Sequence, residues 1–173
     1  MVFERGRQLP ESLASSLQAL ELARAAGDLA LQVKACNNVG YDHAVLGDTR
    51  LGLTYCRLAL DLHRELNEPS LEAHTWDSLG YIYHHLRDYG QAVISYQRAI
   101  SLFREIGARY QTAQSLGHLG DAHHAAGDNQ AARDAWQQAL DILDALAHPE
   151  ATPIRNKLRS PVLTTVTRSD TPR

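Results

Sequence analysis

The sequence has few cysteines, few aromatic residues and no long hydrophobic run. Two cysteines among 173 residues are too few for the disulfide framework of a small secreted domain. Aromatic residues make up only 6% of the chain, which disfavours a β-rich fold. No apolar run approaches the ~18 residues that span a bilayer, and residues 1–7 lack the apolar stretch of a secretory signal. These absences favour a soluble, cytoplasmic protein that does not contact a membrane.

Charge and catalytic motifs are equally sparse. The formal net charge of -3 and the lack of a basic stripe argue against direct nucleic-acid binding. The sequence contains no Gly-x-Ser-x-Gly, no His-Glu-x-x-His and no glycine-rich phosphate loop. Acidic pairs such as Asp61 and Glu65 have the i,i+4 spacing of a solvated helix face. We therefore expect a protein that is not an enzyme and that carries no cofactor and no catalytic or metal site.

What the sequence does contain is a period of forty residues. Shifting it by forty superimposes Val39-Gly40, Leu79-Gly80 and Leu119-Gly120. The other aligned sets are Ala59, Ala99 and Ala139; Cys56, Tyr96 and Trp136; Gly52, Ala92 and Ala132; and the pairs Gly47-Asp48, Arg87-Asp88 and Gly127-Asp128. Agreement at this many positions indicates a repeat protein, in which each unit buries its apolar face against the next.

Each unit carries two apolar stripes at helical spacing, separated by a short polar turn. In the middle unit these predict helices over about 70–86 and 89–106. The turn glycine can take the left-handed conformation that ends one helix, and the following aspartate can cap the next. Arg87 replaces that glycine in the middle unit, so we expect its backbone to be strained.

Glycines recur inside the first helix of each unit, at Gly40, Gly80 and Gly120. A glycine within a helix costs about 1 kcal/mol relative to alanine, so its recurrence needs a steric reason. We expect the paired helix to cross there, so that a side chain would hold the two backbones apart. The larger residues Trp76, Tyr83, Tyr96 and Trp136 are then expected to fill the space where the helices diverge.

The middle unit reads Trp76-x-x-Leu79-Gly80-x-x-Tyr83, followed by Ala92, Tyr96 and Ala99. At these residues the sequence resembles the tetratricopeptide repeat. The resemblance implies an all-α fold, a right-handed superhelical solenoid of antiparallel helix hairpins. It implies three full repeats, at about 28–67, 68–107 and 108–147, within a helical repeat domain of residues 9–158.

The two ends depart from the repeat. Residues 1–8 are expected to be flexible, and residues 9–26 align with a second helix that has no first helix before it. Ser12 and Ser16 make its outer face polar, which favours a capping helix, although a truncated fragment is the alternative. Residues 148–158 predict a short capping helix that places Ile154 and Leu158 over the last hairpin. The polar tail 159–173 is expected to be disordered.

In the tetratricopeptide family the first helices line the concave face, so the resemblance implies a partner-binding groove there. The side chains expected to point into it, besides Ser78, are Lys34, Asn37, Asn38, Tyr41, His74, Asp77, Tyr81, His84, Gln114, His118, Asp121 and His124. This polar surface with a few aromatic residues suits a protein or extended peptide. Lys34 is the single cation of the set, which disfavours the clamp that some family members place on a terminal carboxylate.

Seven of the nine histidines fall in the predicted first helices, and three interpretations of them are open. In the first, His43 and His123 pack at the position of Tyr83, and the others are surface residues. In the second, clustered imidazoles make the groove respond to pH. In the third, His84, His124 and Asp121 converge on a metal, although no ligand motif supports this.

Cys36 and Cys56 fall at the positions of Trp76 and Tyr96, so they are expected to face each other as small buried residues. A disulfide is not expected in a reducing compartment. Because the pair is small, we expect the first unit to be the loosest. Replacing both cysteines with large apolar residues is then expected to raise the melting temperature.

A narrower resemblance concerns the segment from Leu119 to Asp128. It is similar to forty-residue repeats of actinobacterial regulators, of the antibiotic-regulatory and NB-ARC types. The resemblance implies a protein-binding scaffold that forms the sensor part of a transcriptional regulator. A module that forms homodimers through its terminal helices is the alternative.

Overall fold

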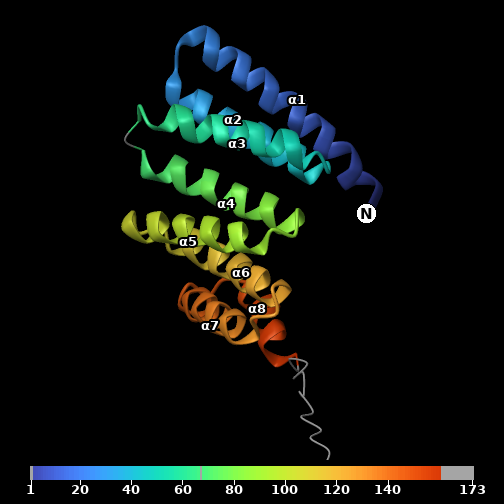
Figure 1. Cartoon of the computed structure of the whole chain (residues 1–173), viewed down its shortest axis with the longest axis vertical. Coiled ribbons are helices and arrows are strands. Elements are labelled where there is room, and N and C mark those ends of the chain that lie inside the picture. The colour runs from blue at the N-terminus through green and yellow to red at the C-terminus, as the bar shows by residue number, and fades with distance from the viewer. Residues whose placement is uncertain (1, 67, 161–173) are drawn as a thin grey trace, which may run out of the picture.

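The computed structural model describes residues 2–66 and 68–160 of the chain. Within these residues the chain forms eight α-helices and no strand. In chain order they are α1 (Val2–Ala26), α2 (Leu29–Val45), α3 (Thr49–His63), α4 (Pro69–His85), α5 (Tyr89–Glu105), α6 (Arg109–Ala125), α7 (Asn129–Ala145) and α8 (Ala151–Arg159). The helices follow one another along the long axis as antiparallel hairpins (Figure 1). The predicted all-α solenoid is confirmed.

The three hairpins are α2–α3, α4–α5 and α6–α7, flanked by α1 and by α8. None of the described helices is both long enough and apolar enough to cross a membrane. The predicted capping helix is confirmed as α8, whose Ile154 is buried in the core of the last hairpin and whose Leu158 packs against it.

The turns within the hairpins end one helix and begin the next as predicted. Asp48, Asp88 and Asp128 each accept a hydrogen bond from the amide three residues later, at 3.0 to 3.1 Å. Each aspartate amide also donates back to the preceding helix, for example from Asp48 to the carbonyl of His43 at 2.8 Å. Arg87 adopts a φ of 60°, which confirms the expected strain. Asn67, the last residue of the first predicted repeat, lies outside the described residues.

The N-terminal helix is longer than predicted. It begins at Val2 and runs through Pro10, so residues 2–8, assigned above to a flexible terminus, are helical. Four of these seven residues are Glu4, Arg5, Arg7 and Gln8, which have high helix propensity. At the other end Arg159 belongs to α8, while residues 161–173 lie outside the described part, so disorder there stays a prediction.

The helical glycines accommodate large side chains of the paired helix. A Cβ built on Gly80 would lie 2.5 Å from the ring of Tyr96, and one built on Gly120 would collide with Trp136. The predicted steric role is therefore confirmed, but its form differs. Tyr96 and Trp136 do not fill space where the helices diverge, because their rings lie directly on the glycines.

The first hairpin packs differently because Cys56 is small. A Cβ on Gly40 would lie 2.6 Å from Cys56 Sγ and 3.0 Å from the carbonyl oxygen of Gly52, so here the two backbones themselves approach. Cys36 and Cys56 are free thiols with no exposed surface. The two helices lie closer together here and fill the volume that an aromatic ring takes elsewhere, which argues against the expectation that this unit is the loosest.

The two serines of α1 bind the neighbouring helix. Ser12 and Ser16 donate hydrogen bonds to the two carboxylate oxygens of Asp42 on α2, at 3.1 and 2.7 Å. Asp42 is buried and takes the position that Ile82 and Ala122 hold in the later units. The polar face predicted from the serines is thus partly engaged with α2, because the carboxylate supplies the acceptors that the hydroxyls need.

Candidate functional site

The first helices α2, α4 and α6 lie beside one another and present the side chains predicted for the groove. We call this surface the concave face. Its exposed members are Lys34, Asn38, Tyr41, His74, Gln114 and His124, and its half-buried members are Asn37, Asp77, Tyr81, His84, His118 and Asp121. Ser78, also expected there, is buried. The structure therefore places the twelve predicted site residues at accessible or partly accessible positions.

Aromatic rings connect α2 with α4 on this face. The ring centroids of Tyr41 and Tyr81 are 5.1 Å apart, and those of Tyr81 and His85 are 4.1 Å apart. Partial burial, together with the neighbouring Tyr81 and acidic groups, raises the pKa of the Tyr41 phenol. Both phenols therefore stay neutral and can donate and accept hydrogen bonds. His85 was not among the side chains predicted for the groove, although its i,i+4 spacing from Tyr81 indicates that the two rings lie close together.

A polar network connects α4 with α6. Ser115 donates a hydrogen bond of 2.6 Å to Oδ1 of Asp77, and Nδ1 of His118 lies 3.5 Å from the same oxygen. Nδ1 is buried and makes no hydrogen bond to any described residue, so its interaction with Asp77 becomes an ion pair when the imidazole is protonated. Burial lowers the pKa of His118, but the Asp77 carboxylate and Asp121 more than offset this, and the net pKa is raised.

The C-terminal end of the concave face forms a cavity of about 300 Å³, which we call the α6–α8 pocket. It is lined by Ala113, Gln114, Gly117, His118, Asp121, Glu150, Pro153, Ile154 and Lys157. Lys157 binds both carboxylate oxygens of Asp121, at 2.6 and 2.7 Å. The indole of Trp136 donates to Asp121 at 3.1 Å and to the Gly117 carbonyl at 3.2 Å.

Lys157 was missed by the sequence analysis, which sought groove cations in the first helices alone. It comes from α8, which lies where a fourth first helix would follow. The positions of Ile154 and Leu158, expected on the last hairpin, could have indicated that Lys157 lies close to the concave face. The face therefore carries a cation near each end, Lys34 and Lys157.

The histidines do not act as one group. Burial lowers the pKa of His74 and of His84, while Asp77 and Asp121 raise that of His118. They would therefore gain protons at different pH values, which weakens the interpretation of a jointly charging groove. His43 stacks on Tyr55 with centroids 5.8 Å apart, as the packing interpretation expects.

A metal site at His84, His124 and Asp121 finds no geometric support. Nδ1 of His124 lies 2.9 Å from the Asn129 side-chain oxygen, the His84 ring packs against Tyr89, and Asp121 binds Lys157. Across residues 2–66 and 68–160, no three His, Cys, Asp or Glu side chains are grouped so that they could hold a metal ion.

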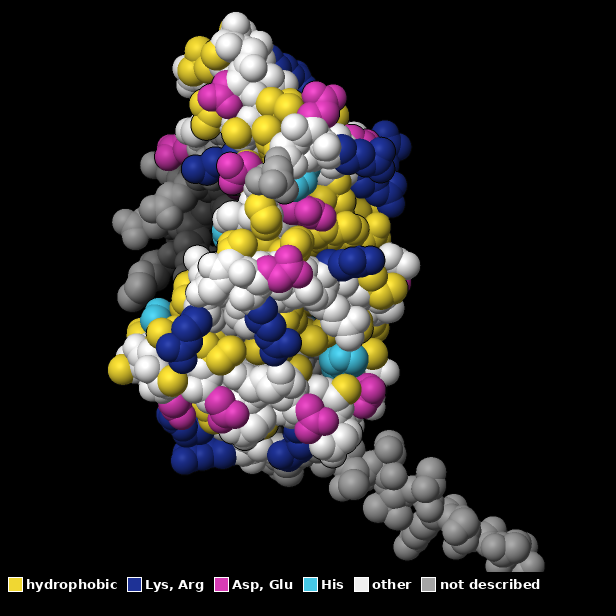
Figure 2. Space-filling model, turned by 90° about the vertical axis from the view of Figure 1, so that its left-hand side faces the viewer, with side chains coloured by type: hydrophobic (Ala, Val, Ile, Leu, Met, Phe, Trp, Pro, Cys, Tyr) yellow, Lys and Arg dark blue, Asp and Glu magenta, His cyan; other side chains and the backbone are white. Residues whose placement is uncertain are grey.

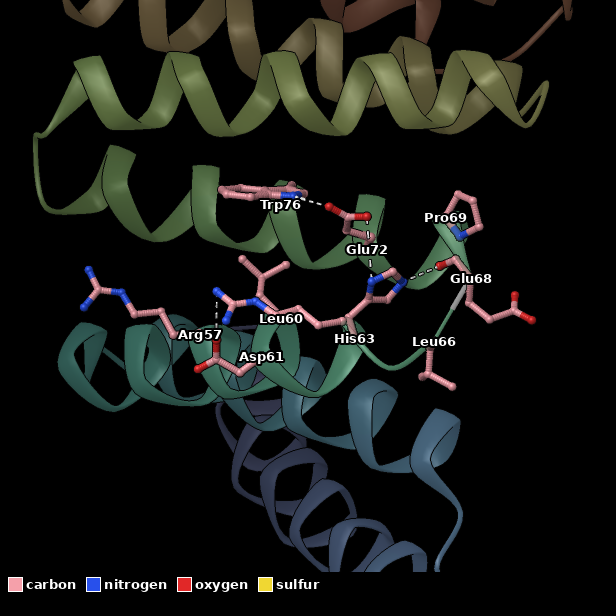
Figure 3. A pocket seen from close by; sticks show the side chains of 10 residues that line it. Arg57, Leu60, Asp61, His63, Leu66, Glu68, Pro69, Glu72 and Trp76 are labelled. Atoms are coloured by element: carbon pink, nitrogen blue, oxygen red, sulfur yellow. Dashed lines mark hydrogen bonds and ion pairs between the residues drawn. The ribbon is translucent and has the colours of Figure 1, made fainter.

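A second cavity, of about 560 Å³, lies between α3 and α4 (Figure 3). His63 points toward α4, where its Nε2 lies 2.8 Å from the Glu68 carbonyl and its Nδ1 lies 3.7 Å from Glu72. Glu72 also accepts a hydrogen bond of 3.1 Å from Trp76. His63 occupies the position of Phe103, so polar contacts replace apolar packing at the junction of the first two units.

Charge is mixed on the face shown in Figure 2, where Lys and Arg side chains are interspersed with Asp and Glu side chains. Hydrophobic side chains lie between them over several helices. A face of this kind lacks the single-sign field that attracts a polyelectrolyte.

Comparison with known proteins supports the architecture. A family model described as tetratricopeptide repeat matches residues 31–105 and, shifted by one unit, residues 71–145. The two matches together span residues 31–145, more than half of the chain. No curated protein sequence matches the chain significantly.

Solved structures with the same arrangement share little sequence with this chain. BtubC (BKLC) from P. vanneervenii is 21% identical, with a TM-score of 0.72 over 87% of this chain and 64% of that one. The apo form of RapI is 16% identical, with a TM-score of 0.73 over 89% of this chain and 43% of that one. A putative kinesin light chain from Podosopora anserina, with nearly identical TPR-like repeats, is 13% identical, with a TM-score of 0.69 over 90% and 78%. The chain thus spans less than two thirds of BtubC and of RapI, and these similarities concern the fold alone.

Proposed function

The chain belongs to the tetratricopeptide repeat family, and on this premise we propose that its concave face binds an extended segment of a partner protein. A scaffold of stacked helical hairpins supports protein–protein interaction, because it presents a long continuous surface built from successive units. We further propose that the chain acts in the cytoplasm and is not an enzyme.

The observation that carries this proposal is the α6–α8 pocket at one end of the concave face. Gln114 and His118 line it together with the ion pair of Asp121 and Lys157. Amide, imidazole, carboxylate and ammonium groups within one cavity can pair with the backbone and side chains of a bound peptide. Further along the face, Asn38 and Tyr81 are accessible for the same purpose.

The partner we propose is a component of a bacterial regulatory system, with this chain as the repeat or sensor part of a transcriptional regulator. The support is the similarity of the segment Leu119 to Asp128 to repeats of such regulators. A switch or DNA-binding protein encoded beside this chain and recovered with it from native extract would support this role. Its absence from the complex would count against the role without affecting the concave face as a binding surface.

Peptide selection tests the concave face directly. Twelve-residue peptides selected from a displayed library on the immobilised chain would be measured by calorimetry against the variants Asn38→Ala, Tyr81→Ala and His118→Ala. We expect each variant to weaken binding about fivefold or more, since each removes a direct contact. The matched controls are Arg98→Ala and Gln137→Ala, at exposed positions on the second helices. Equal affinities for all five variants would exclude the concave face as the binding surface.

A further inference from the structure

A second surface for a partner lies between α1 and α2, beside the N-terminal end of the concave face, with which it shares Lys34 and Asn38. We call it the N-terminal cleft, a cavity of about 420 Å³. It is lined by Ala19, Leu22, Ala23, Ala26, Leu31, Lys34, Ala35 and Asn38. Two of its leucines are among the most exposed large apolar side chains of the described residues, Leu22 at 64% and Leu31 at 52%.

The repeat shows that these positions are normally covered. Ala19 is exposed, whereas Ala59, Ala99 and Ala139 at the same position have no accessible surface. Leu22 and Leu31 correspond to Leu62 and Leu71, which pack against the cluster around Val33, Ala35 and Cys36 of α2. The N-terminal cleft is therefore a helix-packing surface without its helix among the described residues.

The interior hairpins also show what fills such a surface. In the middle unit, Ala73 of α4 packs against three residues of α5, namely Ala99, Phe103 and Leu102. Two units earlier in the repeat, the same positions are held by Ala19, Ala23 and Leu22 of α1, in that order. Ala73 is fully buried there, so the covering helix presents a small residue that lets the two helices approach closely. The matching occupant of the N-terminal cleft is a helix with small apolar residues on one face, running antiparallel to α1.

The described part of the chain does not supply this helix. In the three hairpins the chain reverses at residues 46–48, 86–88 and 126–128. The corresponding residues of α1 are 6–8, and the backbone stays helical through them from Val2 onward. Because α1 does not turn where the hairpins turn, none of the described residues covers this surface.

We propose that the N-terminal cleft binds an amphipathic helix of a separate partner protein, with a small-residue apolar face and one carboxylate beside Lys34. The contacts between α4 and α6 indicate where this carboxylate would lie. Asp77 of α4 accepts from Ser115 and lies near His118 of α6, and these two residues correspond to Ala35 and Asn38 of α2. An acidic residue at the Asp77 position of the docked helix therefore lies next to Asn38 and Lys34.

The charge of the cleft favours a different protein over a second copy. Lys34 is its charged residue, and no carboxylate is among the residues that line it. Two copies related by a twofold axis would bring two ammonium groups together in a partly apolar environment, which is unfavourable. A helix that carries an acid compensates this charge.

The test uses the chain's own α4 as the probe. A fluorescein-labelled peptide of residues 69–86 contains Ala73 and Asp77, and a cross-link replacing Tyr81 and His85, which contact each other in the fold, keeps it helical. Its binding to the full chain is measured by anisotropy. We expect Leu22→Asp and Leu31→Asp each to weaken binding about tenfold or more, because each places a charge in an apolar contact. Ile94→Asp, at an equally exposed apolar position on α5, should leave binding unchanged.

A charge exchange tests the position of the acid. Lys34→Glu should weaken binding about threefold, and a peptide carrying Asp77→Lys should recover it on the Lys34→Glu chain. The proposal is overturned if the peptide does not bind at 1 mM, if Leu22→Asp binds as tightly as the unaltered chain, or if the exchanged pair shows no recovery. Light scattering that reveals a dimer abolished by Leu22→Asp would overturn it too, since a second copy would then occupy the cleft.

Discussion

The two ends of this solenoid solve the same packing problem differently. At the C-terminal end α8 covers the last hairpin, with Ile154 packed beside Gly117 and Lys157 bound to Asp121. At the N-terminal end α1 is much longer than α8, yet it leaves the N-terminal cleft open with Leu22 and Leu31 exposed. Whether the terminal helix buries the apolar surface at its end of the solenoid therefore depends less on its length than on which side of the neighbouring hairpin it packs against.

This difference follows from the way in which a solenoid is stabilised. Each unit contacts mainly its neighbours, so a terminal unit lacks one interface unless another element supplies it. The helix α8 supplies that interface at one end. At the other end, Ser12 and Ser16 donate hydrogen bonds to the buried carboxylate of Asp42, while Ala19, Leu22 and Ala26 of α1 stay exposed.

The largest expected effect concerns Ile154, which is 8% exposed in the last core. We expect Ile154→Asp to lower the free energy of unfolding by about 3 kcal/mol, because α8 must detach or bury a charge. Leu22→Asp at the open end should change it by less than about 0.5 kcal/mol. Urea denaturation followed by circular dichroism measures both. Equal losses would mean that the two ends do not differ in packing.

A second prediction compares the first hairpin with the last. Cys56→Trp copies the residue at the same position in the last unit, Trp136, but Gly40 and Gly52 leave no room for an indole. We expect a loss of about 2 kcal/mol from overpacking, whereas Cys56→Ala should lose only about 1 kcal/mol. Thermal unfolding of both variants checks this. A higher melting temperature for Cys56→Trp would restore the expectation of a loose first unit.

The backbone at the two end junctions gives a smaller effect of opposite sign. Ala147 has a φ of 50° and Gly27 has a φ of 67°, so both occupy the left-handed region. We expect Ala147→Gly to stabilise the chain by about 1 kcal/mol and Gly27→Ala to destabilise it by a similar amount. Melting temperatures that move in the same direction for both variants would contradict this explanation.

The smallest effect is a pH dependence confined to the C-terminal half of the concave face. The pKa of His118 is raised in the folded chain, so its stabilising contribution is complete below the unfolded pKa and is lost as the pH rises through the folded value. The side chain is 41% exposed, so the contribution stays below about 1 kcal/mol.

Subtracting the stability of His118→Gln from that of the unaltered chain isolates this term, because His74 and His84 are common to both proteins. The difference in free energy of unfolding should be larger at pH 5.5 than at pH 8.5. Asn38→Gln, at the same position in the first unit, should show no such change. If the difference for His118→Gln does not vary with pH, Asp77 does not stabilise the protonated form of His118.

The sequence was sufficient where a feature depends on local rules or on the repeat. The aspartate caps, the strain at Arg87, the steric role of Gly80 and Gly120, and the packing of Ile154 all follow from helix geometry and a period of forty. The left-handed backbone of Ala147 could also have been predicted, since Ala147 aligns with Gly107 and Gly27 in the repeat. The concave positions of the first helices were inferred from family resemblance, and the structure leaves their twelve side chains exposed or half-buried.

The contacts between units could not be predicted from helix geometry and the repeat. Lys157 reaches Asp121 over 36 positions of sequence, and Ser12 reaches Asp42 over 30. Such pairs depend on the distance and rotation between packed helices, which propensity and periodicity leave undetermined. The closing of the first hairpin around Cys56 was missed for the same reason, because a small residue can leave a gap or draw two backbones together, and only packing decides between them.

The recurrence of the turn at Asp88 and Asp128 has a consequence for the length of the molecule. Residues 88–127 begin at one capping aspartate and end immediately before the next. A duplicate of this segment placed after Gly127 would offer its own Tyr96 to Gly120 and receive Trp136 on its own copy of Gly120. The solenoid can therefore be lengthened by whole repeat units, and the length of its binding surface would increase with the number of units that a gene encodes.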